Sequence, residues 1–161
     1  MKHYVALAVF AAAVWAGGMA TSASATSKPE SCALLRAKEI SEALTQPASK
    51  AAPSSVPEVC DWRLDSTATR PIGSVHTLVQ RGSVARRSYA LAADFHADDR
   101  EPLAGLGRKA FYAPSLGAVW VLEDTSTVFY VQGVYPTGST LDAADLRDAL
   151  VRLAGRAEAR L

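Results

Sequence analysis

The first 25 residues decide how much of this chain is left to fold into a domain. A basic start precedes an apolar run over residues 4–15, and small residues follow as far as Ala25. This order is typical of a secretory signal peptide with an Ala-x-Ala cleavage site. A membrane span needs about 20 consecutive apolar residues, whereas Gly17 and Gly18 interrupt this run. We therefore expect residues 1–25 to be removed as a signal peptide, with an uncleaved membrane anchor as the alternative.

Residues 26–161 are expected to form a single domain with a short flexible N-terminal leader. The whole chain is 49% apolar and 20% charged, a balance that suits one globular domain. Its formal net charge of +1 gives no reason to expect nucleic acid as a partner. No later stretch reaches membrane-spanning length. The expected partner is therefore an unknown protein or small ligand, and no stable membrane insertion is expected after cleavage.

The chain has two cysteines, Cys32 and Cys60, and both follow the expected cleavage site. Two thiols in an exported protein usually form a disulfide. A bridge between cysteines 28 positions apart in the sequence is expected to raise the free energy of unfolding by about 3.5 kcal/mol in the chain-entropy treatment. A redox or nucleophilic thiol is the alternative, but there is no Cys-x-x-Cys and no nearby histidine to lower the pKa of either thiol. Residues 29–31 also do not match the lipobox of a lipoprotein.

Apolar spacing predicts the order helix, strand, strand, helix, strand, strand, helix. Helices are predicted over 32–44, over 83–95 and from 140 or 141 to about 160, and strands over 60–64, 72–80, 118–122 and 127–134. The intervening segment 48–57 is predicted to be a loop, because Pro53 and Pro57 exclude regular structure. No series of parallel crossovers is evident. We therefore predict an α+β fold in which helices flank an antiparallel sheet.

Two of these helices have an expected buried face. The helix over 83–95 is predicted to bury Val84, Tyr89, Leu91, Ala92 and Phe95 and to turn Arg86, Arg87 and Asp94 toward solvent. The last helix is predicted to bury Leu146, Leu150, Leu153 and Ala157. Asp142 and Asp145 suit the positive N-terminal end of that last helix.

Several short motifs resemble one known family. They are Cys-x-Leu-Leu from Cys32, Cys60-Asp-Trp, Gly-Leu-Gly from Gly105, and Ala-Phe-Tyr from Ala110. Together with the C-terminal Leu-rich helix they resemble the DUF3558 family of small secreted proteins and lipoproteins, over residues 31–153. The resemblance implies a Mog1/PsbP-like α/β/α sandwich and carries no catalytic residue over to this chain.

Two candidate ligand motifs lack the context that their chemistry needs. Gly105 to Ala110 fits Gly-x-Gly-x-x-Ala, but no strand-helix unit surrounds it, so we expect these glycines to turn the chain into the next strand. The segment Asp94 to Asp99, with His96 inside it and His76 as a second histidine, offers possible metal ligands. It lacks the glycine and terminal glutamate of a calcium loop. We expect a solvated helix end and no bound metal or cofactor.

No serine-hydrolase motif is present, and only His76 and His96 are candidate bases in the expected domain. His76 is expected to face outward from its strand. Six cations between residues 81 and 109 are expected to form a solvated face, because four acids lie in the same interval. Aromatic residues on the strands are expected to form core: Trp62, Trp120, Phe129 and Tyr130. Tyr130 and Tyr135 could also supply a partner surface.

These observations favour an exported protein, secreted or periplasmic, that acts as a non-catalytic binding module. No catalytic, cofactor-binding or metal-binding residue is expected, and Cys32 and Cys60 are the only site residues assigned. One alternative is a periplasmic inhibitor or immunity-type protein, which small size, export and one disulfide suit equally well. The other is a hydrolase with a cryptic site, which requires His76 or His96 to meet a nucleophile.

Overall fold

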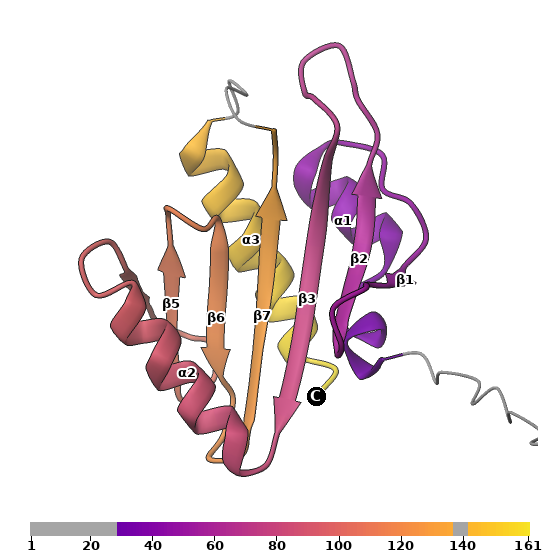
Figure 1. Ribbon diagram of the computed structural model, residues 1–161. Helices are drawn as coiled ribbons and strands as arrows, with labels where there is room; N and C mark the ends of the chain where they lie inside the picture. Colours follow the sequence, from indigo (N-terminus) through magenta and orange to yellow (C-terminus); the bar gives the residue numbers. More distant parts are fainter. Residues whose placement is uncertain (1–28, 137–141) are drawn as a thin grey trace, which may run out of the picture.

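The part of the chain that the structure describes forms a seven-stranded antiparallel sheet with helices on both faces (Figure 1). The computed structural model describes residues 29–136 and 142–161, so the predicted signal peptide lies outside the described residues. The strands in spatial order are β1 (Ala52–Pro53), β2 (Val59–Leu64), β3 (Gly73–Arg81), β7 (Thr127–Val134), β6 (Ala118–Leu122), β5 (Lys109–Ala113) and β4 (Glu101–Leu103). The predicted α+β class is confirmed.

Two helices, α1 (Ala37–Leu44) and α3 (Ala143–Glu158), cover one face of the sheet. The main core lies beneath them, where alternate strand residues such as Trp62 and Phe129 are completely buried. The predicted α3 stripe is confirmed in the buried Leu150, Leu153 and Ala157 and the half-buried Leu146. Asp142 caps α3, since its carboxylate accepts the Ala144 N–H at 2.7 Å.

The third helix, α2 (Ser83–Phe95), lies on the opposite face, and its buried side agrees with the predicted one only at Tyr89 and Ala92, which pack against the sheet. Its sheet-facing residues are Ala85, Ala93 and the half-buried Tyr89. Val84, Leu91 and Phe95 are instead 55%, 69% and 83% exposed. The physical reason is that the strands below present large side chains, including Phe111 and Leu122. The small side chains of Ala85 and Ala93 let the helix lie close to these large side chains. Val84, Leu91 and Phe95 therefore face solvent.

The predicted helix over 32–44 is divided into two pieces. A short 3-10 helix η1 (Glu30–Ala33) comes first, and α1 starts only at Ala37. The Glu39 side chain accepts the Arg36 N–H at 2.8 Å, which marks a new helix start. The Ser31 carbonyl accepts the Thr77 hydroxyl at 2.9 Å, so η1 is held against β3. The start of the predicted helix therefore serves as an attachment to the sheet.

Three strands were not predicted: β1, β4 and β5. The segment expected to be a loop contains β1, whose Pro53 is tolerated because β1 is an edge strand. At the other edge lies β4, which is three residues long and contains Pro102. β5 lacks alternation because both of its faces are covered: Ala110 belongs to the core under α3, whereas Phe111 packs under α2.

Candidate functional site

The disulfide between Cys32 and Cys60 is present, with a Cα–Cα distance of 5.0 Å. It joins η1 to β2, and both cysteines belong to the buried core. This agrees with the predicted pairing. Among the described residues, no helix has the length and apolar composition needed to cross a membrane.

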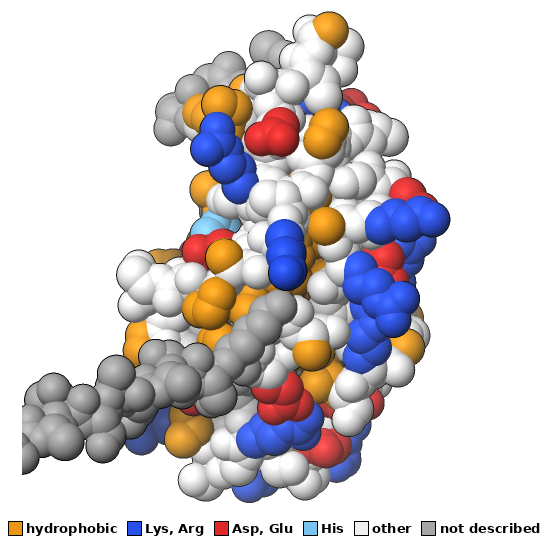
Figure 2. All heavy atoms as spheres, turned by 90° about the vertical axis from the view of Figure 1, so that its right-hand side faces the viewer, with side chains coloured by type: hydrophobic (Ala, Val, Ile, Leu, Met, Phe, Trp, Pro, Cys, Tyr) orange, Lys and Arg blue, Asp and Glu red, His pale blue; other side chains and the backbone are white. Residues whose placement is uncertain are grey.

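One part of the sheet carries no helix of the described residues on the α2 side. Over β2, β3 and the adjacent part of β7 the outward side chains are partly exposed, and we call this surface the open face: Asp61, Arg63, Ser74, His76, Tyr130 and Gln132. Figure 2 shows this side of the molecule at its left, hollowed, with a histidine and an acidic side chain in the hollow. The open face is mainly polar, in contrast to the apolar core behind the same strands.

Three of these side chains form a continuous hydrogen-bonded chain. The His76 Nδ1 lies 2.6 Å from a carboxylate oxygen of Asp61, and the His76 Nε2 lies 2.7 Å from the Ser74 hydroxyl. The His76 side chain is 25% exposed. Each imidazole nitrogen therefore has its own partner, which fixes the plane of the ring.

The hairpin register brings these residues together. Ser74 and His76 are two residues apart on β3 and so share a face. Asp61 lies directly opposite His76 on β2, and Arg63 lies directly opposite Ser74. His76 lies on the outer face of its strand, as predicted. Its contacts with Asp61 and Ser74 were not predicted from the sequence, because they depend on the register of the strands.

The arrangement has two chemical uses. The carboxylate, imidazole and hydroxyl follow the order of a nucleophile with its base and orienting group. They also form a fixed set of hydrogen-bonding groups for a partner. Ser74 lies on a strand that is paired on both sides, with Arg63 and with Val134. Backbone N–H groups in such a strand are engaged in the sheet, so a developing oxyanion would need a side-chain donor; Arg63, which lies opposite Ser74 and pairs with Asp65 at 3.7 Å, is a candidate.

The second candidate histidine, His96, lies at the C-terminal end of α2 and is 7% exposed. Its Nδ1 is 3.4 Å from both the Ser115 hydroxyl and an Asp99 carboxylate oxygen. Both neighbours therefore face the same nitrogen, and no proton can pass between them through the ring. Hydrogen bonds from Ser115 lower the pKa of the Asp99 carboxyl. This cluster fastens the end of α2 to the turn after β5.

The other candidate motifs have structural roles. Within residues 29–136 and 142–161, no three His, Cys, Asp or Glu side chains are grouped so that they could hold a metal. Gly105 and Gly107 have φ values of +81° and +48° and lie between β4 and β5. They turn the chain into the next strand, as predicted, and a strand rather than a helix follows them.

The six cations are distributed over different surroundings. Arg81 forms an ion pair with Glu30 that lowers the pKa of that carboxyl, and Arg87 borders a hollow on the outer side of α2. The other four line a groove between α2 and the strands β4 and β5, which we call the cationic groove: Arg86, Arg100, Arg108 and Lys109. The prediction of one solvated face is therefore too simple.

The aromatic residues divide between the two sides of the sheet. Trp62 and Phe129 belong to the core under α1 and α3, as predicted. Trp120 and Tyr130 are half-buried on the α2 side, with ring centroids 4.9 Å apart. Burial raises the pKa of the Tyr130 hydroxyl, and the charge of Asp61 adds to the shift. Tyr135 is half-buried and donates a hydrogen bond to the Gln46 side chain at 3.1 Å.

Function has to be inferred from the chain's own residues. Neither the protein-family models, nor the curated proteins, nor the solved structures include a match to this sequence or fold.

Proposed function

We propose that this chain is an exported binding module, secreted or periplasmic, that recognises its partner through the open face and catalyses no reaction. The observation that carries the proposal is the unequal covering of the sheet: α1 and α3 cover one face, whereas on the other α2 contacts β6, β7 and part of β3, and no described helix covers β2 or the rest of β3. The disulfide is compatible with export, because such bridges persist in oxidising compartments.

The composition of the open face supports recognition of a partner. Asp61 and Arg63 supply opposite charges from one strand, and the fixed imidazole of His76 lies between them and β7. Tyr130 adds an aromatic ring, and tyrosine and arginine are enriched among residues that dominate interface energies. A fixed set of such groups loses little conformational entropy when a partner binds.

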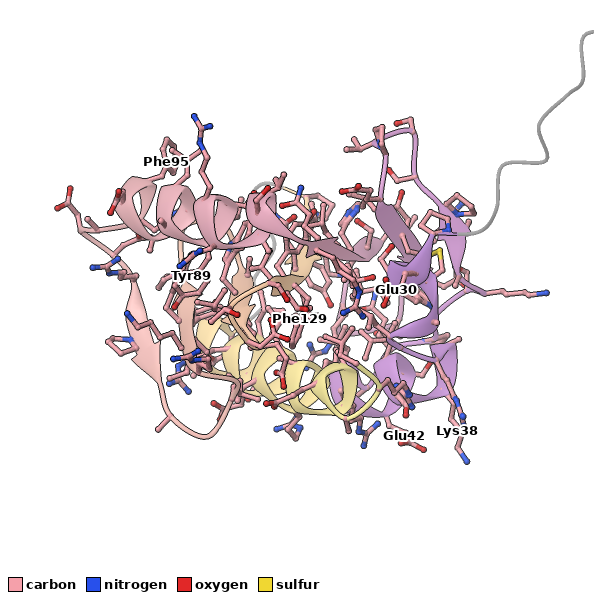
Figure 3. The ribbon with its side chains drawn as sticks, turned by 90° about the horizontal axis from the view of Figure 1, so that it is seen from below. Glu30, Lys38, Glu42, Tyr89, Phe95 and Phe129 are labelled. Atoms are coloured by element: carbon pink, nitrogen blue, oxygen red, sulfur yellow. A yellow bond between two sulfur atoms is a disulfide. The ribbon has the colours of Figure 1, made fainter. Side chains whose placement is uncertain are left out.

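The test compares two exposed cations on opposite sides of the sheet. Arg63→Gln removes a charge from the open face, and Lys38→Gln removes one from α1 on the far side, where Figure 3 shows Lys38. Immobilised mature protein is used to capture partners from the envelope and medium of the producing cell. A partner retained by wild type and Lys38→Gln but lost by Arg63→Gln and His76→Gln supports the proposal. Equal capture by all four proteins contradicts it.

A hydrolase is the second candidate, favoured by the chain from Asp61 through His76 to Ser74. In this case the Ser74 hydroxyl attacks the acyl carbon of an ester while the His76 Nε2 takes its proton. The same imidazolium then protonates the departing alcohol, and water releases the acyl group. Asp61 stabilises the imidazolium, and Arg63 faces Ser74 across the strands.

The two candidates predict different reactivity of Ser74. A fluorophosphonate labels a serine that a histidine activates, and mass spectrometry then locates the label. If the binding proposal holds, no label appears on Ser74, and neither His76→Ala nor His96→Ala changes the rate at which the protein hydrolyses a test ester. Stoichiometric labelling that Ser74→Ala and His76→Ala abolish, while Ser115→Ala retains it, would replace the binding proposal with the hydrolase.

Membership of the DUF3558 family and the Mog1/PsbP-like form of the sandwich remain predictions from the sequence motifs. The order of layers, with α2 on one side of the sheet and α1 and α3 on the other, is compatible with such a sandwich. Cleavage after Ala25 is tested by N-terminal sequencing of the exported protein.

A further inference from the structure

The cationic groove lies outside the open face and has the dimensions of a small-molecule site. Its volume is about 620 Å³, and its lining comes from α2, from the turn after it, and from β4 and β5. Small ligands commonly occupy pockets of about 300–1,000 Å³. The groove is a second candidate binding site, separate from the open face, because none of its lining residues belongs to that face.

The cations of the groove have no acidic partners among the described residues. Neither Arg86, Arg108 nor Lys109 forms an ion pair or a side-chain hydrogen bond there. Arg100 donates one hydrogen bond, to the Ala93 carbonyl at 2.7 Å, which leaves most of its guanidinium N–H groups unused. Several donors around one hollow are therefore available to a ligand.

Acids that lie close in the sequence are engaged elsewhere. Glu101 accepts a hydrogen bond from the Arg147 Nε at 2.7 Å, on the α3 side of the fold. Asp99 accepts the Ser115 N–H at 3.0 Å. Asp94 is the acid in the lining of the groove, and Asp124 borders an adjoining hollow that shares Arg86, Arg108 and Lys109 with it. The four cations therefore outnumber the acids around them.

An apolar wall completes the groove. Tyr89 points from α2 toward the sheet, whereas Phe95 points away from it (Figure 3). The Tyr89 and Phe111 rings meet edge to face, with centroids 5.4 Å apart. Burial raises the pKa of the Tyr89 hydroxyl, while the charge of Arg100 opposes the shift. Leu122 also lines the groove. A ligand that fits must combine an anionic group with an apolar body.

We propose that the cationic groove binds a small organic phosphate, with the phosphate among the cations and an apolar or aromatic body against Tyr89 and Phe111. A phosphate monoester carries about two negative charges at neutral pH and offers three acceptor oxygens. Guanidinium groups match phosphate oxygens in a paired geometry, and a lysine adds a point charge. A carboxylate has one charge and two oxygens, so it uses fewer of the available donors.

Phenyl phosphate is a suitable probe because it combines both parts of the expected ligand. Its binding to the mature protein is measured by calorimetry at low salt, beside inorganic phosphate, benzoate and phenol. We expect saturable binding of phenyl phosphate that weakens with added salt. Inorganic phosphate and benzoate are expected to bind more weakly, and phenol not at all. Absence of saturable phenyl phosphate binding, or equally tight binding of benzoate or phenol, overturns the proposal.

Two adjacent arginines of α2 provide matched variants. Arg86→Gln removes a cation of the groove, and Arg87→Gln makes the same charge change on the outer side of the helix. Loss of charge-assisted hydrogen bonds in Arg86→Gln is expected to weaken phenyl phosphate binding about tenfold. Arg87→Gln is expected to change it by less than about twofold. An equal loss in both variants overturns the proposal, because it would indicate a general charge effect.

The open-face variant separates this proposal from the proposed function. Arg63→Gln should leave phenyl phosphate binding unchanged, because Arg63 is not part of the groove. A loss of phenyl phosphate affinity in Arg63→Gln as large as that in Arg86→Gln would contradict the assignment of the phosphate to the groove. Capture of a protein partner depends on the open face alone, so either proposal can fail while the other holds.

Discussion

Reducing the disulfide should remove a large part of the stability of this fold. The bridge joins positions 28 residues apart in the sequence. Closing a loop of this length in the unfolded chain corresponds to about 3.5 kcal/mol of stability. Folded domains are stable by only about 5–15 kcal/mol. For a domain of this size the loss corresponds to a lowering of the melting temperature by about 10 °C.

The contacts that remain determine what the reduced protein looks like. Without the bridge, η1 is still attached by the hydrogen bond from Thr77 to Ser31 and by the exposed ion pair of Arg81 with Glu30. An exposed pair contributes about 0–1 kcal/mol, and a neutral hydrogen bond contributes about 1 kcal/mol. We therefore expect a folded but destabilised sheet, with η1 exchanging its amide hydrogens first.

Urea unfolding followed by tryptophan fluorescence measures this effect. The oxidised wild type is compared with the reduced wild type and with the double variant Cys32→Ala and Cys60→Ala. Alanine is used because a buried serine hydroxyl would need a new hydrogen-bond partner. The reduced protein and the double variant should unfold at similar, lower urea concentrations. Identical midpoints for oxidised and reduced wild type would refute the reasoning, since the bridge would then constrain nothing.

Two further changes test the turn before β5 and a half-buried acid. Gly107→Ala should destabilise the fold by more than about 2 kcal/mol, because its φ is +48° and a Cβ would lie 2.6 Å from the Leu122 carbonyl oxygen. Gly105→Ala is the control, with a positive φ but nothing within 4 Å; equal urea midpoints would contradict the steric account. Burial, and then the nearby charge of Glu158, raises the pKa of Glu123. Its ionisation therefore opposes folding above its folded pKa, so Glu123→Gln should raise the melting temperature at pH 7 and have less effect near pH 4. An equal effect at both pH values would contradict this assignment.

Much of the fold could be predicted because β2 and β3 alternate, β6 and β7 are runs of β-branched and aromatic residues, and the last helix has one clear apolar stripe. The pairing of β6 with β7 follows from the short polar turn over residues 123–126 that joins them. β5 could not be found in this way. Side chains from both of its faces are buried, so its sequence Lys-Ala-Phe-Tyr-Ala shows no alternation of apolar and polar residues.

The buried side of α2 was predicted only in part, because the largest apolar side chains of this helix are exposed and the small Ala85 and Ala93 are buried. A sequence pattern gives most weight to large apolar residues such as Leu91 and Phe95. In the folded protein the burial of a side chain depends on whether its shape fits the neighbouring surface. The small side chains of Ala85 and Ala93 fit against the large side chains of the sheet. The surface of the sheet under α2 determines which face of the helix is buried. The sequence of the helix alone carries no information about that surface.

The candidate sites depend on spatial pairing that the sequence carries only in part. Alternation on the two strands places Asp61 and His76 on the same side of the sheet. Their direct contact depends on the hairpin register, which the long loop between β2 and β3 does not reveal. The cationic groove was missed for a similar reason. One acid that is close to these cations in the sequence, Glu101, forms an ion pair with Arg147 of α3.

Both borders of the sheet limit how copies of this molecule can associate. At one border the final strand has two residues and ends in Pro53, and at the other it has three residues with Pro102 in the middle. Proline has no N–H to donate, so an approaching chain finds few main-chain groups with which to extend the ladder. Growth of the sheet into a fibril would therefore first require these short strands to detach from the folded protein.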